Sequence, residues 1–245
     1  GVMIRALQGE RGIFPLVDLK AAVRRRAKHL PNSKMISIEQ TTNLGGGAVW
    51  PLQTIAEVAD VATSSGLRLH MDGARLINAV VASAIEAKDH AAPFDSVYMD
   101  FTKGLGAPMG AILAGNADFI EQAWVWKQRL GGSMRQAGLL AEACIFALDN
   151  NIGQIETDHI NAKRFATLIS DIEGVAVRPV ETNMVFFEIA ETGLQASEFN
   201  AKLEAHGARV SIQGSTILRA VTHLGVNQAG IEHAASAIRT IIEGA

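Results

Sequence analysis

The chain has 245 residues, of which 48% are hydrophobic and 19% are charged, and its formal net charge is −3. This composition indicates a globular protein with a substantial core, and the length suits one large domain or two modest ones. It excludes the strongly basic field of a nucleic-acid-binding protein. No apolar run reaches the ~18 residues of a membrane span, and no signal peptide is recognisable, so we expect a cytoplasmic protein.

Helices and strands are predicted to alternate over the first half of the chain. Apolar residues recur every three or four positions in the helices and form short runs in the strands. This order favours an α/β fold with a mostly parallel central sheet flanked by helices. The predicted helices cover residues 17–29, 55–65 and 76–85, and the predicted strands cover residues 35–39, 67–71, 96–101 and 110–114.

The second half begins with a long helical stretch and then becomes a small α+β domain. We place the boundary near residue 150, with a large domain at 1–150 and a small C-terminal domain at 151–245. Cys144, the single cysteine, excludes a disulfide framework within the chain and is expected to be a small core residue. The predicted helices cover residues 119–129, 134–149, 152–172, 196–205 and 228–242, and the predicted strands cover residues 175–178, 183–189, 210–213 and 217–222.

Two short segments that follow predicted strands carry chemically useful residues. The first contains Asp72 within HMDGAR, and the second contains Lys103 within TKGLGAP. Ligands of parallel α/β sheets bind where the strands end, so both side chains are expected at one crevice. The spacing leaves a plain alternative open, because Asp-Gly is a turn signal and a lysine before glycines is often a solvated loop residue.

One cofactor, pyridoxal 5′-phosphate (PLP), needs this pair of groups. The amine of a lysine forms the Schiff base with its aldehyde. A carboxylate, here Asp72, keeps its pyridine nitrogen protonated through a charge-assisted hydrogen bond. The hydroxyl of Thr102 is a candidate donor to the phosphate, and the glycines after Lys103 allow the backbone to approach closely. No metal site is expected.

Four segments in this order resemble the threonine aldolase family over nearly the whole chain. They are residues 70–78 (HMDGARLIN), 96–110 (SVYMDFTKGLGAPMG), 130–138 (LGGSMRQAG) and 218–224 (LRAVTHL). The resemblance implies the PLP-dependent transferase fold of type I, with a large cofactor domain and a small C-terminal domain.

The resemblance also implies roles for individual residues. Lys103 matches the Schiff-base lysine, and Asp72 matches the partner of the pyridine nitrogen. Arg75 matches an arginine near the cofactor and the substrate carboxylate, and Arg219 matches a second carboxylate-binding arginine. Arg135 matches an arginine near the phosphate, contributed within the subunit or by a neighbouring one, with a surface position as the alternative.

Three other positions are expected to be structural. His70 is expected on the face of its strand opposite to Asp72, packed rather than catalytic. His223 is expected to orient or pack neighbouring groups. Trp124 and Trp126 are expected in the core or at a subunit interface.

The sequence departs from the family in two places. Thr42 stands where many members have a histidine that is a candidate for handling the substrate hydroxyl proton, and threonine is a poor base. The family is longer at its N-terminus, where we expect a Gly-Thr or Gly-Ser phosphate cradle and a histidine that stacks on the pyridine ring. No such cradle precedes residue 43 in this chain.

The expected reaction is retro-aldol cleavage of a β-hydroxy-α-amino acid, such as threonine or allo-threonine to glycine and acetaldehyde. The alternatives are a PLP-dependent β-eliminating lyase of the same fold and a truncated, non-catalytic subunit. We expect a small amino-acid substrate, no nucleic acid or membrane partner, and a homodimer or homotetramer.

Overall fold

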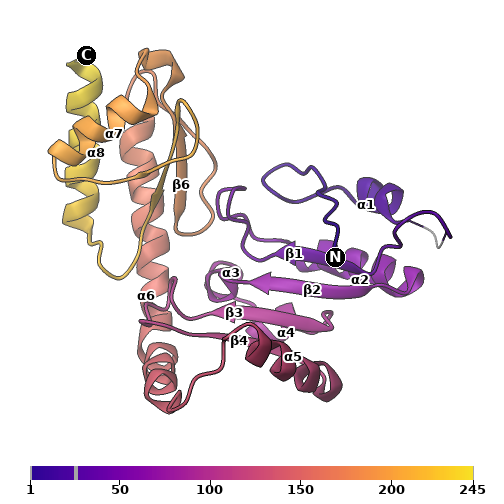
Figure 1. Ribbon diagram of the computed structural model, residues 1–245. Helices are drawn as coiled ribbons and strands as arrows, with labels where there is room; N and C mark the ends of the chain where they lie inside the picture. The colour runs from indigo at the N-terminus through magenta and orange to yellow at the C-terminus, as the bar shows by residue number, and fades with distance from the viewer. Residues whose placement is uncertain (1, 25–26, 245) are drawn as a thin grey trace. The chain divides into compact units, whose positions relative to one another are not determined.

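The computed structural model describes residues 2–24 and 27–244 of the chain. The chain forms two compact units, Gly1–Asn151 and Ile152–Ala245. Each unit has a four-stranded sheet of its own (Figure 1).

The first unit is built around a mostly parallel sheet. Its strands lie side by side in chain order; β2 is parallel to β1 and β3, and β4 runs antiparallel to β3 (Figure 1). The flanking helices and this strand order confirm the predicted α/β class. The elements are α1 (Leu16–Ala22), β1 (Met35–Glu39), α2 (Leu52–Ser65), β2 (Arg68–Gly73), α3 (Leu76–Ser83), α4 (Ala87–Ala91), β3 (Ser96–Asp100), β4 (Ala111–Gly115), α5 (Ala117–Arg129) and the start of α6 (Gly138–Ser170).

The two faces of β1 and β2 differ in polarity. Ile36, Ile38 and Leu69 are buried in one apolar cluster with residues of α2. His70 and Asp72, which alternate with the buried residues of β2, point to the other face and are only partly buried. A parallel strand covered on both faces reads as a continuous apolar run, so this alternation marks a polar face of the sheet.

The second unit is an antiparallel α+β domain with its own core. Its strands lie in the order β5–β6–β8–β7. Phe187 is fully buried at the centre, with ring centroids 6.2 Å from Phe165 and 6.3 Å from Phe199, both edge-on. The elements after α6 are β5 (Ala176–Val177), β6 (Met184–Glu188), a 3-10 turn (Ala190–Thr192), α7 (Ala196–Ala205), β7 (Ser211–Ile212), β8 (Ile217–Val221) and α8 (Gln228–Glu243).

The helix predicted over residues 17–29 is wrong in its second half. The residue after α1 is extended, with ψ of 118°. The amide of Arg24 then donates to the Ser33 hydroxyl at 3.0 Å, an acceptor from beyond the predicted helix. This side-chain acceptor replaces the carbonyl that a continuing helix would supply. Residues 25 and 26 of the prediction lie outside the described residues.

The two helices predicted over 134–149 and 152–172 are one helix, α6. The expected break fell at Asn150 and Asn151, whose side chains often compete with helical backbone bonds. Here the Asn150 amide donates to the carbonyl one turn earlier at 2.8 Å, and the Asn151 amide donates to Leu105 O at 2.7 Å. Neither side chain opposes the helix. Despite the length of α6, no described helix is apolar enough to cross a membrane.

Helix α5 lies on the surface of the first unit and has no buried residues. Trp124 and Trp126 are 56% and 57% exposed, so their predicted place in the core is wrong. The Lys127 ammonium lies 4.7 Å from the Trp124 ring centroid, and the Arg129 guanidinium lies 5.2 Å from that of Trp126. The alternative prediction, a subunit interface, stays a prediction. Cys144, in contrast, is buried as expected.

Gly73 is the last residue of β2, where the neighbouring strand β3 leaves no room for a side chain. A Cβ built on Gly73 would lie 2.4 Å from the backbone oxygen of Tyr98 on the neighbouring strand. We expect Gly73→Ala to separate the two strands and to lower the free energy of unfolding by roughly 2 kcal/mol or more. Gly138→Ala is the control, because a Cβ there meets nothing within 4 Å. Equal denaturation midpoints for both variants would contradict this role of Gly73.

Asp158 is a buried carboxylate in α6, within the second unit. Its side chain is fully buried, and neither oxygen has a hydrogen-bond partner of good geometry among the described residues. Burial raises the pKa of Asp158 to about 6, and Gln154, one turn earlier, offsets only part of that effect. The adjacent His159 shows the opposite effect, because burial and the Lys163 charge lower its pKa to about 4.

The raised pKa makes stability depend on pH. The folded state keeps its proton up to about pH 6, whereas an unfolded aspartate loses it near ~4, so stability falls as pH rises between these values. We expect Asp158→Asn to remove this fall and to gain up to about 2 kcal/mol at pH 7.5. Urea unfolding at pH 4.5 and 7.5 measures it, with exposed Asp171→Asn as control. A variant less stable than the parent at pH 7.5 would show that the ionised carboxylate is stabilised.

Candidate active site

The carboxyl ends of β1, β2 and β3 lie next to one another at one edge of the first sheet. Asp72 pairs with Glu39 on one side and with Tyr98 on the other. Side chains of paired residues in parallel strands point to the same face, and the direction repeats every second residue. Asp72, Tyr98 and Asp100 therefore share the polar face of the sheet.

Asp72 is the residue before the end of β2, and its side chain closes the turn that follows the strand. Its Oδ1 accepts the backbone N–H of Ala74 at 3.1 Å. Among the described residues this is the one hydrogen bond of the Asp72 side chain, which leaves Oδ2 available to a further donor. Arg75 is the N-cap residue of α3, and its backbone N–H donates to the Gln40 carbonyl at 3.2 Å. The loops after β1 and β2 are thus tied together beside Asp72.

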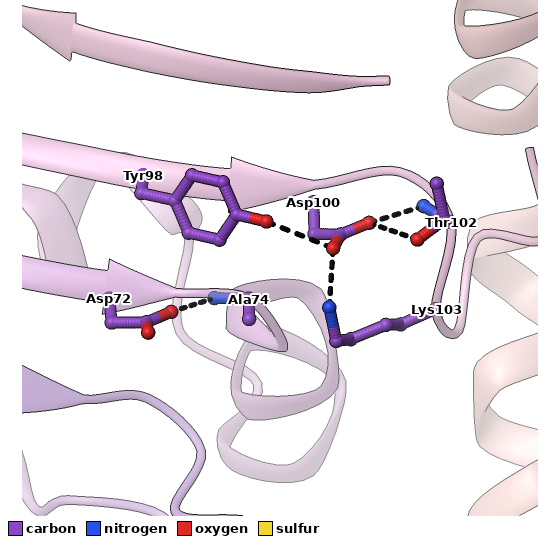
Figure 2. A network of polar contacts seen from close by, with 6 residues as sticks. All are labelled: Asp72, Ala74, Tyr98, Asp100, Thr102 and Lys103. Carbon is purple, nitrogen blue, oxygen red and sulfur yellow. Dashed lines mark hydrogen bonds and ion pairs between the residues drawn. The ribbon is translucent and has the colours of Figure 1, made fainter. Parts of the chain in front are cut away.

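Lys103 reaches back from the loop after β3 to the carboxylate of Asp100. Figure 2 shows its side chain running toward the Asp100 oxygen that the Tyr98 hydroxyl also meets, with Thr102 at the other oxygen of that carboxylate. The Tyr98 hydroxyl donates to Asp100 Oδ2 at 2.9 Å, and the Lys103 ammonium donates to the same oxygen. Asp100 Oδ1 accepts the Thr102 N–H at 2.5 Å and the Thr102 hydroxyl at 2.6 Å. The Lys103 ammonium is therefore held on the face that carries Asp72.

The charges in this network shift each other's protonation. Burial by itself would raise the pKa of Asp100, but hydrogen bonds from Lys103, Thr102 and Tyr98 outweigh it and lower that pKa to about 2. Burial, the hydrogen bond to Asp100 and the negative charges of Asp100 and Asp72 raise the pKa of Tyr98 to about 12. At neutral pH the network contains an ionised Asp100 and a neutral Tyr98.

The expected orientation of His70 is wrong. Residues two positions apart in a strand point to the same face, so His70 lies on the face of Asp72, not opposite to it. Its Nδ1 is 2.8 Å from the Ser96 hydroxyl oxygen. Burial lowers the pKa of His70, and the nearby Asp72 charge opposes this effect. His70 therefore lies two residues before Asp72 on the same face of β2, and its lowered pKa favours the neutral imidazole.

The loop after β1 is held by buried polar side chains. The Gln40 amide accepts the Trp50 N–H at 3.0 Å and donates to the Trp50 carbonyl at 3.3 Å. Thr42 is 2% exposed, and its hydroxyl oxygen accepts the Ala48 N–H at 3.1 Å. The residue that stands in the place of the family histidine therefore closes the loop.

Of the remaining predicted residues, Thr102 belongs to this network, whereas Arg135 and Arg219 lie apart from it in the chain. Thr102 is exposed, and its hydroxyl hydrogen is donated to Asp100, so it must leave that carboxylate before it can donate to a phosphate. Arg135 is exposed in the turn before α6. Arg219 belongs to the second unit, on β8, where it pairs with Phe186 and Ser211. The roles of these three residues stay predictions.

Sequence reasoning missed two residues of the network, Tyr98 and Asp100. A signal was present, because they alternate along a predicted strand and Asp100 stands at its end, the usual place of an aspartate that caps a turn. No sequence pattern indicated that the Lys103 side chain turns back to pair with Asp100, three residues earlier.

A cavity of about 770 Å³ lies elsewhere in the first unit. It is lined by α1, the end of α2 and residues 32–34 just before β1, and it contains none of the predicted site residues. It therefore lies at the amino end of β1, whereas the network lies at the carboxyl end of the sheet.

Comparison with known proteins identifies relatives over most of the chain. The family model described as beta-eliminating lyase matches residues 1–192. The low specificity L-threonine aldolase of Escherichia coli (strain K12) is 36% identical over 231 residues, which cover 94% of this chain and 67% of that protein. The probable low-specificity L-threonine aldolase 2 of Arabidopsis thaliana is 35% identical over 247 residues, covering 98% of this chain and 70% of the plant protein.

The fold comparison agrees with the sequence comparison. The crystal structure of a putative L-allo-threonine aldolase from Listeria monocytogenes EGD-E superimposes with a TM-score of 0.76 at 24% identity, and the match covers 96% of this chain and 67% of that one. This confirms the predicted type I fold. Because the family model covers most of the chain and relatives exceed a third identity, the chain belongs to the beta-eliminating lyase family of PLP-dependent enzymes.

Proposed function

We propose that Lys103 is the amine that bonds PLP and that Asp72 is the carboxylate that faces its pyridine nitrogen. The observation that carries this proposal is the arrangement at the strand ends. Asp72 keeps one oxygen without a hydrogen-bond partner among the described residues, on the sheet face that also holds the Lys103 ammonium. PLP requires an amine for its aldehyde and a carboxylate oxygen for its pyridine N–H. This face of the sheet offers both, so the residues fit the cofactor.

Other residues of the chain would complete the cofactor site. Thr102, once its hydroxyl leaves Asp100, is our candidate donor to the phosphate, and Arg135 is a candidate counter-charge for it. Arg75, the N-cap residue of α3, is our candidate to contact the cofactor or the substrate carboxylate. When bound, PLP supplies an electron-withdrawing ring that takes up the electron pair of the broken bond.

We propose retro-aldol cleavage of a β-hydroxy-α-amino acid, with threonine or allo-threonine as the substrate class. The Cα–Cβ bond breaks, the β-hydroxyl loses its proton as the aldehyde leaves, and Cα gains a proton to give glycine. Support comes from the relatives above, of which one is named a low specificity L-threonine aldolase and another a probable low-specificity L-threonine aldolase. Arg75 and Arg219 are the candidates to bind the substrate carboxylate, because a guanidinium suits bidentate contact, and this contact would orient the bond that breaks.

Thr42 is not placed to accept the β-hydroxyl proton. Its hydroxyl oxygen already accepts a backbone N–H and the side chain is 2% exposed. A threonine hydroxyl is also a weak base at neutral pH. A different proton acceptor must therefore serve this reaction.

Replacement of Lys103 tests the cofactor role. We expect Lys103→Ala to lose completely the absorbance band near ~420 nm that the parent shows with PLP, because no other residue at the strand ends offers an amine. Borohydride reduction followed by intact-mass measurement should then leave the variant without the added mass of PLP. Lys88→Ala is the control, since Lys88 pairs with Glu86 on the surface. A variant that keeps the band would remove Lys103 from this role.

Product analysis tests the reaction. With threonine or allo-threonine, we expect glycine and acetaldehyde in equal amounts. A β-eliminating lyase of the same family would instead release ammonia and a keto acid, as in pyruvate from serine. Finding ammonia and a keto acid as the main products would replace the aldol proposal with the alternative.

A further inference from the structure

Asp100 binds two groups of the loop after β3 that belong to the proposed cofactor site, the Lys103 ammonium and the Thr102 hydroxyl. Its side chain is 9% exposed, against 36% for Lys103. One oxygen accepts the Thr102 hydroxyl and amide, and the other accepts the Tyr98 hydroxyl and the Lys103 ammonium. We propose that Asp100 is a positioning residue whose charge holds the Lys103 ammonium in place and slows its attack on an aldehyde until the pair opens. This inference rests on the proposed bond between Lys103 and the cofactor.

The chemistry of the amine explains the slowing. To form a Schiff base, the lone pair of Nζ attacks the aldehyde carbon, the amine loses its protons, and the carbonyl oxygen leaves as water. An ammonium that donates to Asp100 has no lone pair to offer. The ion pair must therefore open, and a proton must leave, before the C–N bond forms.

The turn at the end of β3 does not by itself require a charged residue. An asparagine accepts a backbone N–H through its own Oδ1 and forms the same turn. Its Nδ2 replaces the oxygen that accepts Lys103, and the Tyr98 hydroxyl can accept from this new donor. Asp100→Asn thus keeps the turn and removes the charge, which makes it the matched variant for this proposal.

Asp100 does not serve as a proton carrier in this proposal. Its four donors, from Lys103, Thr102 and Tyr98, lower its pKa to about 2, so it stays ionised over the working range of the enzyme. Its contribution is a fixed negative charge with a fixed direction. A glutamate in its place keeps that charge, so Asp100→Glu should retain much of the effect.

The first experiment labels the cofactor-free chain with formaldehyde and cyanoborohydride. An aldehyde this small needs no cofactor site, and mass spectrometry of peptides gives a methylation rate for each lysine. We expect Asp100→Asn to raise the Lys103 rate about three- to fivefold, the size expected for a partly exposed ion pair. Lys88 is the internal reference, because its partner Glu86 is unchanged. Asp100→Glu and Tyr98→Phe, which keep the charge, should stay close to the parent.

The dependence of the Lys103 labelling rate on salt distinguishes an electrostatic role of Asp100 from a purely structural one. Raising the ionic strength screens a partly exposed pair, so Lys103 labelling in the parent should accelerate while that of Asp100→Asn stays flat. This comparison uses the parent chain, so it remains informative if the variant folds poorly. A parent rate independent of salt, or a variant rate equal to the parent rate, overturns the proposal.

The second experiment separates the amine from the phosphate. The rate at which the band near ~420 nm appears is followed with PLP and with pyridoxal, which lacks the phosphate. Acceleration of Asp100→Asn with both aldehydes supports an effect on Lys103. Acceleration with PLP alone would mean that Asp100 acts by repelling the phosphate, and this overturns the proposal. If neither aldehyde produces a band in the parent, the proposed cofactor role of Lys103 fails, while the formaldehyde result still decides the role of Asp100.

Discussion

The parallel pairing of β2 with both of its neighbours sets where the groups of the candidate site lie. It brings three strand ends to one edge, so loops that are distant in sequence meet there. It also aligns side chains by face, which puts Asp72 beside Tyr98 and leaves Asp100 two residues further along. A shift of the register by one residue would turn all of these side chains into the apolar core. The site therefore depends on the same pairing that forms the core.

The two aspartates at these strand ends form the same kind of turn but differ in what they can still bind. Asp72 accepts one backbone N–H and is otherwise available. Asp100 accepts four hydrogen bonds, from Tyr98, Thr102 and Lys103, and has little capacity left for a ligand. The difference supports distinct roles, with Asp72 facing the cofactor and Asp100 holding the chain's own groups.

Much of this could be predicted from the sequence, because strand periodicity and turn signals are local. They located the strands that end at Asp72 and near Lys103, and family resemblance connected the two. The errors arose where a distant contact decided the outcome. The first helix ends early where the chain after Pro31 supplies a side-chain acceptor, and α6 continues where the Asn151 side chain finds the Leu105 carbonyl.

The site shows the same limit. His70 was assigned to the wrong face although the period of a strand is sufficient to place it. The position of Asp100 at the end of a predicted strand was a signal, but its contact with Lys103 was not predictable, since the fold-back of a flexible lysine side chain leaves no pattern in sequence. The ends of strands were therefore predictable, whereas the partners of their side chains were not.

Comparison of Asp100 with Asp158 shows why burial alone does not identify a functional carboxylate. Burial raises the pKa of both, yet Asp100 ends near about 2 and Asp158 near about 6. The difference comes from donors, because Asp100 receives an ammonium, two hydroxyls and an amide, whereas Asp158 has no hydrogen bond of good geometry among the described residues. A carboxylate that remains ionised can hold a cation in place, and one that takes up a proton cannot. The number and kind of donors, rather than the depth of burial, therefore decide whether a buried aspartate stays ionised and can hold a cation such as the Lys103 ammonium.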